Sequence, residues 1–284
     1  MAAVCVSGYL NAHAALVHRR TLTWSCRPLR SLPVSSVFRQ CEFRFYEELN
    51  DFLKPEWRKR SFTHTFDGTP AVKDRIESLG VPHTEVDLIL VDGDAVPFAH
   101  KLRGGERVAV YPMFERLELA GTNRLRPRPL RQPRFVLDVH LGRLAAYLRL
   151  LGFDCLYRND YHDDELLTIS RAEHRTVLTR DTGLLKRAAL THGAFLHAID
   201  PRRQLREVLD RFQLESRIAP FTRCARCNGV VEQLPGEQAA TTVPADIARR
   251  QCDFSRCNSC GQVYWPGSHL TRLRQRLAEV GVTI

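Results

Sequence analysis

The sequence predicts an α/β protein in which helices flank a parallel sheet, with a smaller α+β unit ahead of the sheet and a cysteine-rich module behind it. Three observations support this. Strand-like and helix-like segments alternate over residues 135–217, short strands surround one helix over residues 41–120, and four of the nine cysteines form two CxxC pairs. A chain of 284 residues has room for two or three cores of roughly 100–200 residues each.

The amino-acid composition limits which binding partners and which cellular compartment we expect. The formal net charge is +10, so the field around the molecule favours polyanions such as nucleic acid. No apolar run approaches the roughly 18–20 residues that a membrane span needs, and no membrane association is expected. Two paired cysteine motifs among otherwise scattered thiols suit a metal site in a reducing compartment. We therefore expect a cytoplasmic protein.

Residues 1–40 contain five arginines and no Asp or Glu. They show neither helical nor strand periodicity, and we expect a disordered basic extension. An organellar transit peptide has a similar composition, and this alternative stays open.

Residues 41–120 predict a small α+β unit. The segment CEFRFYEEL alternates like a strand, TPAVKDRIESLG predicts a short helix that ends on Gly80, and VDLILVDG and GERVAVYP predict further strands. This order resembles the ubiquitin-like β-grasp fold of the ThiS/MoaD sulfur carriers. Those carriers end in a free Gly-Gly, whereas Gly104 and Gly105 are internal here. Sulfur transfer is therefore not expected, and we interpret the unit as a docking element for a protein partner or RNA.

A linker rich in arginine and proline, residues 121–134, separates this unit from the next. Four strands then alternate with helices over residues 135–217, in the segments FVLDV, HLGRLAAYLRLLG, FDCLY, DDELLTISRAEH, TVLTR, DTGLLKRAAL, AFLHA and PRRQLREVLDRF. Adjacent parallel strands require such crossovers, so the pattern predicts a parallel sheet covered by helices.

Acidic side chains follow two of these strands. Asp138 lies at the end of the first predicted strand, and Asp181 directly follows the third. In open parallel sheets, ligands bind beyond the carboxyl ends of the strands, where the strand order reverses. If the first and third strands flank that point, the two carboxylates converge.

The helix after the second strand supplies candidates for a third acid. Asp at a helix start often serves only as a cap, so we favour Asp164, with Asp163 as cap and Glu165 as alternate. Asp200 precedes Pro201 and is interpreted as a cap. Clustered carboxylates favour a catalytic Mg²⁺ or Mn²⁺. Candidate phosphate-binding side chains are Arg143, Arg180 and Lys186; a proton-carrying role for His140 is weaker than an ordinary hydrogen-bonding one.

The two CxxC pairs predict a structural zinc site. Its ligands are Cys224, Cys227, Cys257 and Cys260, and four thiolates close the tetrahedral shell of Zn²⁺. Cys252 and His269 are weaker substitutes. We expect a zinc ribbon over residues 218–272 and a C-terminal helix or tail over 273–284. Near the ribbon, Arg223, Arg226, Arg256 and exposed Tyr264 and Trp265 could contact RNA, or the aromatics could cover the ribbon core.

The segments FVLDVHLGRLAAYLRLLGFDCLYRND, DDELLTISRAEHRTVLTRDTGLLKR, RCARCNGVVE and CNSCGQVYWPGSH resemble the Mut-seven C-terminal ribonuclease domain. That family is PIN-like, carries a zinc ribbon and often follows a β-grasp unit. The resemblance covers roughly residues 41–272. It implies metal-dependent RNA cleavage through Asp138, Asp181 and Asp164 or a neighbour. The alternative function is an inactive RNA-binding adaptor with a structural zinc ribbon.

Overall fold

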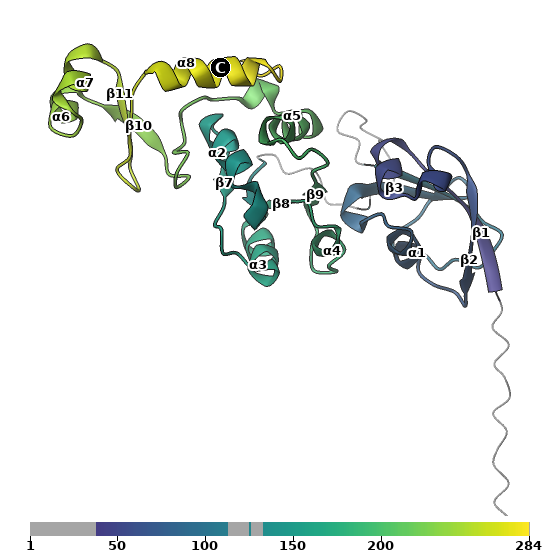
Figure 1. The fold of residues 1–284 in the computed structure, drawn as a ribbon. Helices are drawn as coiled ribbons and strands as arrows, with labels where there is room; N and C mark the ends of the chain where they lie inside the picture. The colour runs from purple at the N-terminus through teal and green to yellow at the C-terminus, as the bar shows by residue number, and fades with distance from the viewer. Residues whose placement is uncertain (1–37, 113–124, 126–132, 284) are drawn as a thin grey trace, which may run out of the picture. The chain divides into compact units, whose positions relative to one another are not determined.

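The structure is a computed structural model that describes residues 38–112, 125 and 133–283. It contains a five-stranded mixed sheet, a four-stranded parallel sheet and a three-stranded antiparallel sheet (Figure 1). Within the described ranges, no helix is long and apolar enough to cross a bilayer. The predicted disorder of residues 1–40 lies almost entirely outside the described residues, as does most of the predicted linker.

The first sheet has the order β2-β1-β5-β3-β4. Its strands are β1 (Phe38–Phe45), β2 (Phe62–Asp67), β3 (Val86–Val91), β4 (Asp94–Ala95) and β5 (Arg107–Pro112), and α1 (Val72–Ser78) is its α-helix. Strands β1 and β5 run parallel at the centre, and β2 and β3 pair antiparallel with them. This arrangement confirms the predicted β-grasp unit.

Buried and exposed side chains alternate along β1, and the buried ones form part of the core of the β-grasp domain. Cys41, Phe43 and Phe45 are buried on one face of the strand, where they pack with Val72 and Ile76 of α1. Gly104 and Gly105 both have positive φ, 96° and 89°, and form the turn that leads into β5. The Gly-Gly pair is therefore a structural turn in this chain.

The second sheet has the order β7-β6-β8-β9, with every pair parallel. Its strands are β6 (Phe135–Leu137), β7 (Cys155–Leu156), β8 (Thr176–Thr179) and β9 (Gly193–Phe195). The helices between and after them are α2 (Gly142–Leu150), α3 (Asp163–Glu173), α4 (Thr182–Leu185) and α5 (Pro201–Arg211). The chain places β7 on one side of β6 and β8 on the other, so the strand order reverses between β6 and β8, which is the condition that the sequence analysis left open.

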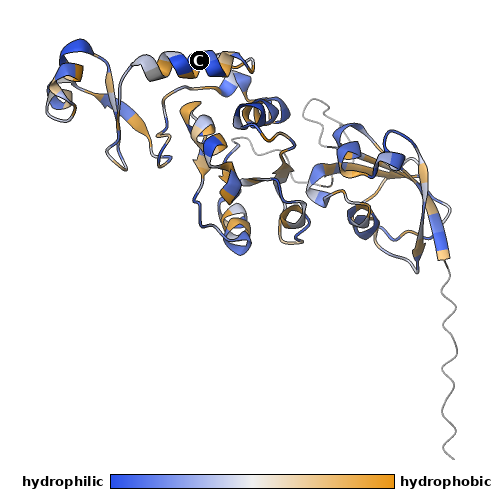
Figure 2. Cartoon of the chain, viewed as in Figure 1, coloured by the Kyte–Doolittle hydropathy of each residue, from blue (hydrophilic) through white to orange (hydrophobic). Residues whose placement is uncertain are grey.

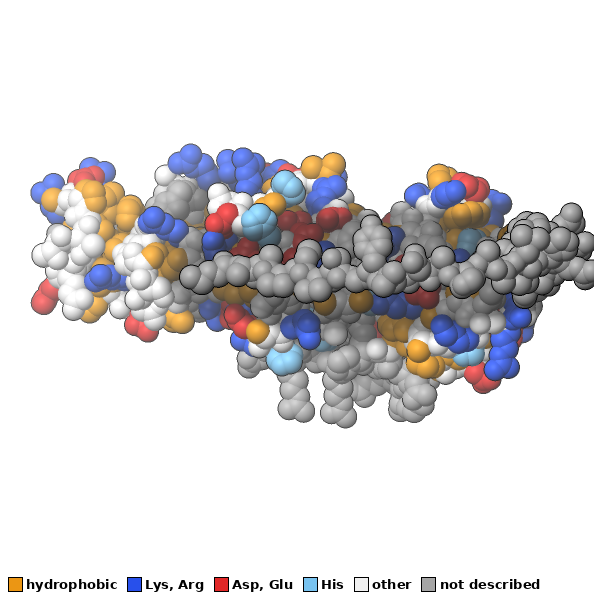
Figure 3. Space-filling view, turned by 90° about the horizontal axis from the view of Figure 1, so that it is seen from below, with side chains coloured by type: hydrophobic (Ala, Val, Ile, Leu, Met, Phe, Trp, Pro, Cys, Tyr) orange, Lys and Arg blue, Asp and Glu red, His pale blue; other side chains and the backbone are white. Residues whose placement is uncertain are grey.

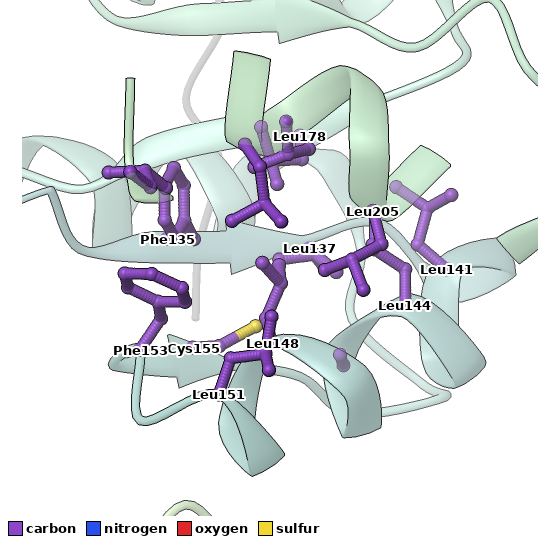
Figure 4. Packing of buried hydrophobic residues seen from close by; sticks show 14 of the residues in the cluster. Phe135, Leu137, Leu141, Leu144, Leu148, Leu151, Phe153, Cys155, Leu178 and Leu205 are labelled. Atoms are coloured by element: carbon purple, nitrogen blue, oxygen red, sulfur yellow. The ribbon is translucent and has the colours of Figure 1, made fainter. Parts of the chain in front are cut away.

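The two faces of this sheet are covered by different helices. Phe135 and Leu137 of β6 pack with α2 and α5 (Figure 4), whereas Val136 between them packs against α3 and α4 on the other face. The strands are buried on both sides, as parallel strands between helical layers are. Figure 2 shows the corresponding colours, with hydrophobic residues on the strands and both hydrophobic and polar residues on the helices that cover them.

The third sheet belongs to the cysteine-rich module. Its strands are β10 (Val231–Leu234), β11 (Phe254–Cys257) and β12 (Val263–Tyr264); α6 (Gly236–Ala240) and α7 (Ala245–Arg250) lie between the first two. The last helix, α8 (Ser268–Ala278), begins before the predicted boundary at residue 273. Its buried Leu277 joins the core formed by β6, α2 and α5.

Several elements differ in length from the prediction. Strand β1 begins at Phe38 and ends at Phe45, and Glu47–Phe52 form a 3-10 helix. The segment DTGLLKRAAL was expected to form one helix, but α4 ends at Leu185. The chain then turns so that buried Leu190 can pack beside α4 before β9 begins at Gly193.

Candidate active site and metal centre

Asp138 and Asp181 are connected through one buried threonine. Asp138 follows β6, and Asp181 comes two residues after Thr179, the last residue of β8. Thr179 donates its hydroxyl to Asp138 Oδ2 at 2.7 Å and accepts the Asp181 backbone N–H at 2.9 Å. Thr179 is fully buried, so the link is protected from water. The two acids therefore both lie where the strand order reverses.

Each acid also caps the turn that follows it. Asp138 Oδ1 accepts the N–H of Val139 at 2.6 Å, and Asp181 Oδ1 accepts the N–H of Gly183 at 2.7 Å. These bonds hold one oxygen of each carboxylate in a defined direction. The carboxylates are therefore oriented before any ligand binds.

A pocket of about 690 Å³ opens at this edge of the sheet. We call it the acidic pocket; its lining residues are Asp138, Val139, His140, Tyr161, His162, Asp163, Asp164, Asp181 and Arg187. Figure 3 shows Asp and Glu side chains gathered in a hollow, with His, Lys and Arg side chains beside them. The structure thus brings Asp138, Asp181 and the start of α3 to one cavity.

The three acids at the start of α3 have different surroundings. Glu165 accepts the backbone N–H of His162 at 2.9 Å in a capping box, so His162 is the N-cap. The predicted capping role of Asp163 is wrong, because Asp163 is the first residue inside the helix. Asp164 is 83% exposed and pairs with Arg187 at 2.6 Å. Asp200 is a cap as predicted, since it accepts the N–H groups of Arg202 and Arg203.

The predicted phosphate-binding side chains lie elsewhere. Lys186 donates to the Glu77 carbonyl at 3.0 Å, and Arg180 donates to the Ala198 carbonyl at 2.8 Å. Arg143 is exposed on α2. None of these three is among the residues described as lining the acidic pocket, whereas Arg187 is. Sequence reasoning missed Arg187, which follows the end of α4 at Leu185, because its pairing with Asp164 depends on the tertiary structure.

The four predicted thiols form a compact group. The sulfur atoms of Cys224, Cys227, Cys257 and Cys260 all lie within 4.8 Å of one another. Burial opposes ionisation of Cys224, but the Tyr264 hydroxyl at 3.1 Å, with nearby backbone N–H groups, lowers the pKa of this thiol to about 6. Four thiols gathered in this way, with Cys224 readily ionised, fit a structural Zn²⁺. In the described ranges, this is the one group of three or more His, Cys, Asp or Glu side chains close enough to hold an ion directly.

Other residues near the thiols do not extend this group. Cys252 is exposed and is not part of it, and the side chain of His269 lies outside what the structure describes. Tyr264 and Trp265 were expected to be exposed but are half-buried. Tyr264 bonds to Cys224, and Trp265 packs on the small core formed by Leu234, Phe254 and Val263. These positions favour the interpretation that the two aromatic side chains cover the core of the ribbon over the interpretation that they contact RNA. Arg226 and Arg256 are at the knuckles, while Arg223 approaches Asp154 at 3.5 Å.

Two family models match the chain. The Mut7-C RNAse domain model matches residues 133–277, and the Mut7-C ubiquitin model matches residues 39–118. Comparison with curated proteins and with solved structures gave no match. The first match covers the parallel sheet, the acidic pocket and the four cysteines, and it indicates a nuclease-like function. The chain therefore belongs to the Mut7-C RNAse domain family and carries a Mut7-C ubiquitin domain ahead of its nuclease domain.

Proposed function

We propose that the chain is a metal-dependent ribonuclease that hydrolyses RNA phosphodiester bonds at the acidic pocket. The observation that carries this proposal is the Asp138–Thr179–Asp181 connection at the carboxyl ends of two adjacent parallel strands. Both acids also line one pocket, and carboxylates in a shared pocket repel one another unless a cation neutralises them. The net charge of +10 supports RNA as the substrate.

Two carboxylates of the acidic pocket are the proposed ligands of a divalent cation. Asp138 and Asp181 offer the oxygen ligands that Mg²⁺ and Mn²⁺ prefer. When bound, such an ion supplies an activated water and neutralises charge on the phosphodiester. A pocket of about 690 Å³ leaves room for the waters that Mg²⁺ retains.

The third acid in this proposal is Asp163, in place of the initially favoured Asp164. Residues three, four and seven positions after Asp163 are Leu166, Leu167 and Ser170, all buried, so Asp163 lies on the helix face that packs against the sheet. Asp164 pairs with Arg187, and Glu165 is used in the capping box. We expect Asp163→Asn to raise the Mn²⁺ concentration for half-maximal cleavage more than Asp164→Asn or Glu165→Gln does. A larger effect at Asp164 would reverse the assignment.

Arg187 is the proposed phosphate contact. It lines the acidic pocket and is half-exposed in its pair with Asp164. A guanidinium presents donors that match phosphate oxygens. Arg187→Ala should therefore raise the KM for RNA, because the contact is made with substrate as well as with the transition state.

The deciding experiment compares acid variants on labelled RNA with Mn²⁺ or Mg²⁺. Asp138→Asn and Asp181→Asn should each lose at least a hundredfold in rate, the scale expected when a charge-stabilising group is removed. Asp200→Asn is the matched control, since it changes an acid that caps α5 outside the pocket, and Asn also caps helices well. Equal cleavage by the wild type and both pocket variants would identify a contaminating nuclease and contradict the proposal.

The second candidate is a catalytically inactive RNA-binding adaptor. It is favoured by the capping bonds of Asp138 and Asp181, because these show that both acids also have a structural use. In that case wild-type protein would bind RNA without cleaving it in either metal. In both candidates the β-grasp domain is a site for a protein partner. We also propose a cytoplasmic location, where free thiols can take up zinc.

A further inference from the structure

Among the described strands, β7 pairs with β6 alone and is the open edge of the nuclease sheet. An edge strand leaves backbone donors and acceptors without a partner strand. Here two side chains take the place of that strand at Cys155. Asn228 Oδ1 accepts the Cys155 N–H at 2.9 Å, and Arg149 Nε donates to the Cys155 carbonyl at 2.8 Å.

Asn228 belongs to the first cysteine knuckle, directly after Cys227. The knuckle closes on itself, because Cys224 N–H bonds to the Gly229 carbonyl and Asn228 N–H bonds to the Cys224 carbonyl. Asn228 has a φ of 71°, a left-handed conformation that Asn tolerates better than most residues. Its amide then donates to Asp154 Oδ1 at 2.8 Å. The fold of the knuckle therefore decides where this side chain points.

Arg149 joins the same knuckle from the nuclease side. It lies on α2 with only 4% of its surface exposed. Besides Cys155, its guanidinium donates to the carbonyls of Ala225 and Arg226 at 3.2 and 3.0 Å. A buried charge is stable only while these acceptors are in place. Loosening the knuckle would leave Arg149 buried without them.

The contacts continue from β7 to the acidic pocket through Tyr157, which follows β7 directly. Its hydroxyl donates to the Val139 carbonyl at 2.9 Å. Val139 also donates its N–H to Asp138 Oδ1. Gly142 allows this arrangement, because a Cβ there would lie 2.7 Å from the Tyr157 hydroxyl. A short chain of contacts thus joins the cysteine knuckle to the carboxylate of Asp138.

We propose that the cysteine knuckle clamps the open edge of the nuclease sheet, with Asn228 and Arg149 as positioning residues that act on Asp138 through β7 and Tyr157. Zinc on the four thiols fixes the knuckle, and the knuckle fixes β7. The catalytic consequence rests on the proposed ribonuclease function, whereas the coupling between the knuckle and the sheet edge can be measured without any activity.

The first test uses amide hydrogen exchange on the full chain. Asn228→Gly removes the side chain but keeps the left-handed backbone free of strain. With zinc content equal to the wild type, the variant should exchange at least about tenfold faster over residues 153–157 and 138–142, because it loses the hydrogen bonds to Cys155 and Asp154. Asn258→Gly is the control, because Asn258 is an exposed asparagine within the second knuckle. Exchange at the wild-type rate in both segments of Asn228→Gly would overturn the clamp.

Removal of zinc from the wild type with a chelator should accelerate exchange in the same two segments. The same treatment of Asn228→Gly should add little, because the contact that transmits the change is already gone. Unaltered exchange in the chelated wild type contradicts the proposal.

The catalytic consequence is tested with Tyr157→Phe, which removes only the hydroxyl. This variant should keep its zinc and need several times more Mn²⁺ for half-maximal cleavage, with a nearly normal rate at saturating Mn²⁺. An unchanged Mn²⁺ requirement would show that the Tyr157 hydroxyl does not link β7 to Asp138. If the wild type fails to cleave RNA at all, the proposed function fails, while the exchange measurements still decide on the clamp.

Discussion

At the residue scale, Thr179 illustrates what sequence reasoning could and could not find. Asp138 and Asp181 were predicted because each follows a strand-like segment and parallel strands end at one edge. Thr179 was missed, because a threonine inside TVLTR is an ordinary strand residue. Its bonds to Asp138 and to the backbone of Asp181 depend on which strands are neighbours, which the linear pattern does not specify.

Replacement of Thr179 by Val should damage the site with little change in shape. The hydroxyl is lost from a fully buried position, so Asp138 loses a donor and the Asp181 N–H loses its acceptor. We expect a loss of about 1–3 kcal/mol in the free energy of unfolding and a marked fall in cleavage rate. Thr176→Val, a buried threonine of the same strand, is the control. Equal stability and activity of the two variants would argue against the connecting role.

Gly142→Ala should destabilise the protein although it lies in a helix. Gly142 has helical angles, φ −58° and ψ −35°, and Ala at such a position normally stabilises by about 1 kcal/mol. The added Cβ would instead displace Tyr157, so we expect a lower melting temperature. In a Tyr157→Ala background the same change should become neutral or stabilising. A higher melting temperature for the single variant would show that Tyr157 adapts at no cost.

At the element scale, the alternation of apolar residues recovered the strands and helices but not all their lengths. The β-α order of both sheets and the position of α3 and α5 followed from periodicity and helix-start signals. The lengths of β7 and α4 did not, because they are set by tertiary packing. Strand β7 pairs with one neighbour over two residues, and α4 ends early so that Leu190 can reach the core.

His64 on strand β2 should make the free energy of unfolding depend on pH. His64 lies on the inward face of the strand beside Phe43, and its Nε2 is buried without a hydrogen-bond partner in the described structure. Burial, with the nearby charge of Arg75, lowers the pKa of His64. The folded state therefore binds a proton less readily than the unfolded state, so stability is full above about pH 6.5 and falls as the pH drops toward the lower folded pKa.

His64→Leu should remove the part of the pH dependence of stability that is caused by His64. Urea titrations between pH 5 and 7.5 should show a smaller loss of unfolding free energy in the variant than in the wild type. His197→Leu, at an exposed histidine, provides the comparison. Parallel pH curves for the wild type and His64→Leu would mean that His64 takes no part.

At the scale of the whole molecule, the net charge of +10 should govern RNA affinity. Each phosphate that the protein neutralises contributes about −0.7 to the slope of log affinity against log salt for a single strand. We expect binding to weaken steeply as salt rises, measured by fluorescence anisotropy with Asp138→Asn to prevent cleavage. Arg187→Ala should reduce the slope by close to one such contribution. A slope near zero would exclude phosphate contacts as the source of affinity.

The position of Leu277 has a consequence for how such proteins diversify. The core of the parallel sheet takes Leu277 and Val282 from the far side of the cysteine-rich module, so that module lies within the nuclease fold as an insertion. A recombination event that removed the module and the residues after it would also remove Leu277 and Val282, and this would leave a cavity beside the leucines of α2 and α5. Nuclease and ribbon should therefore be inherited as one unit.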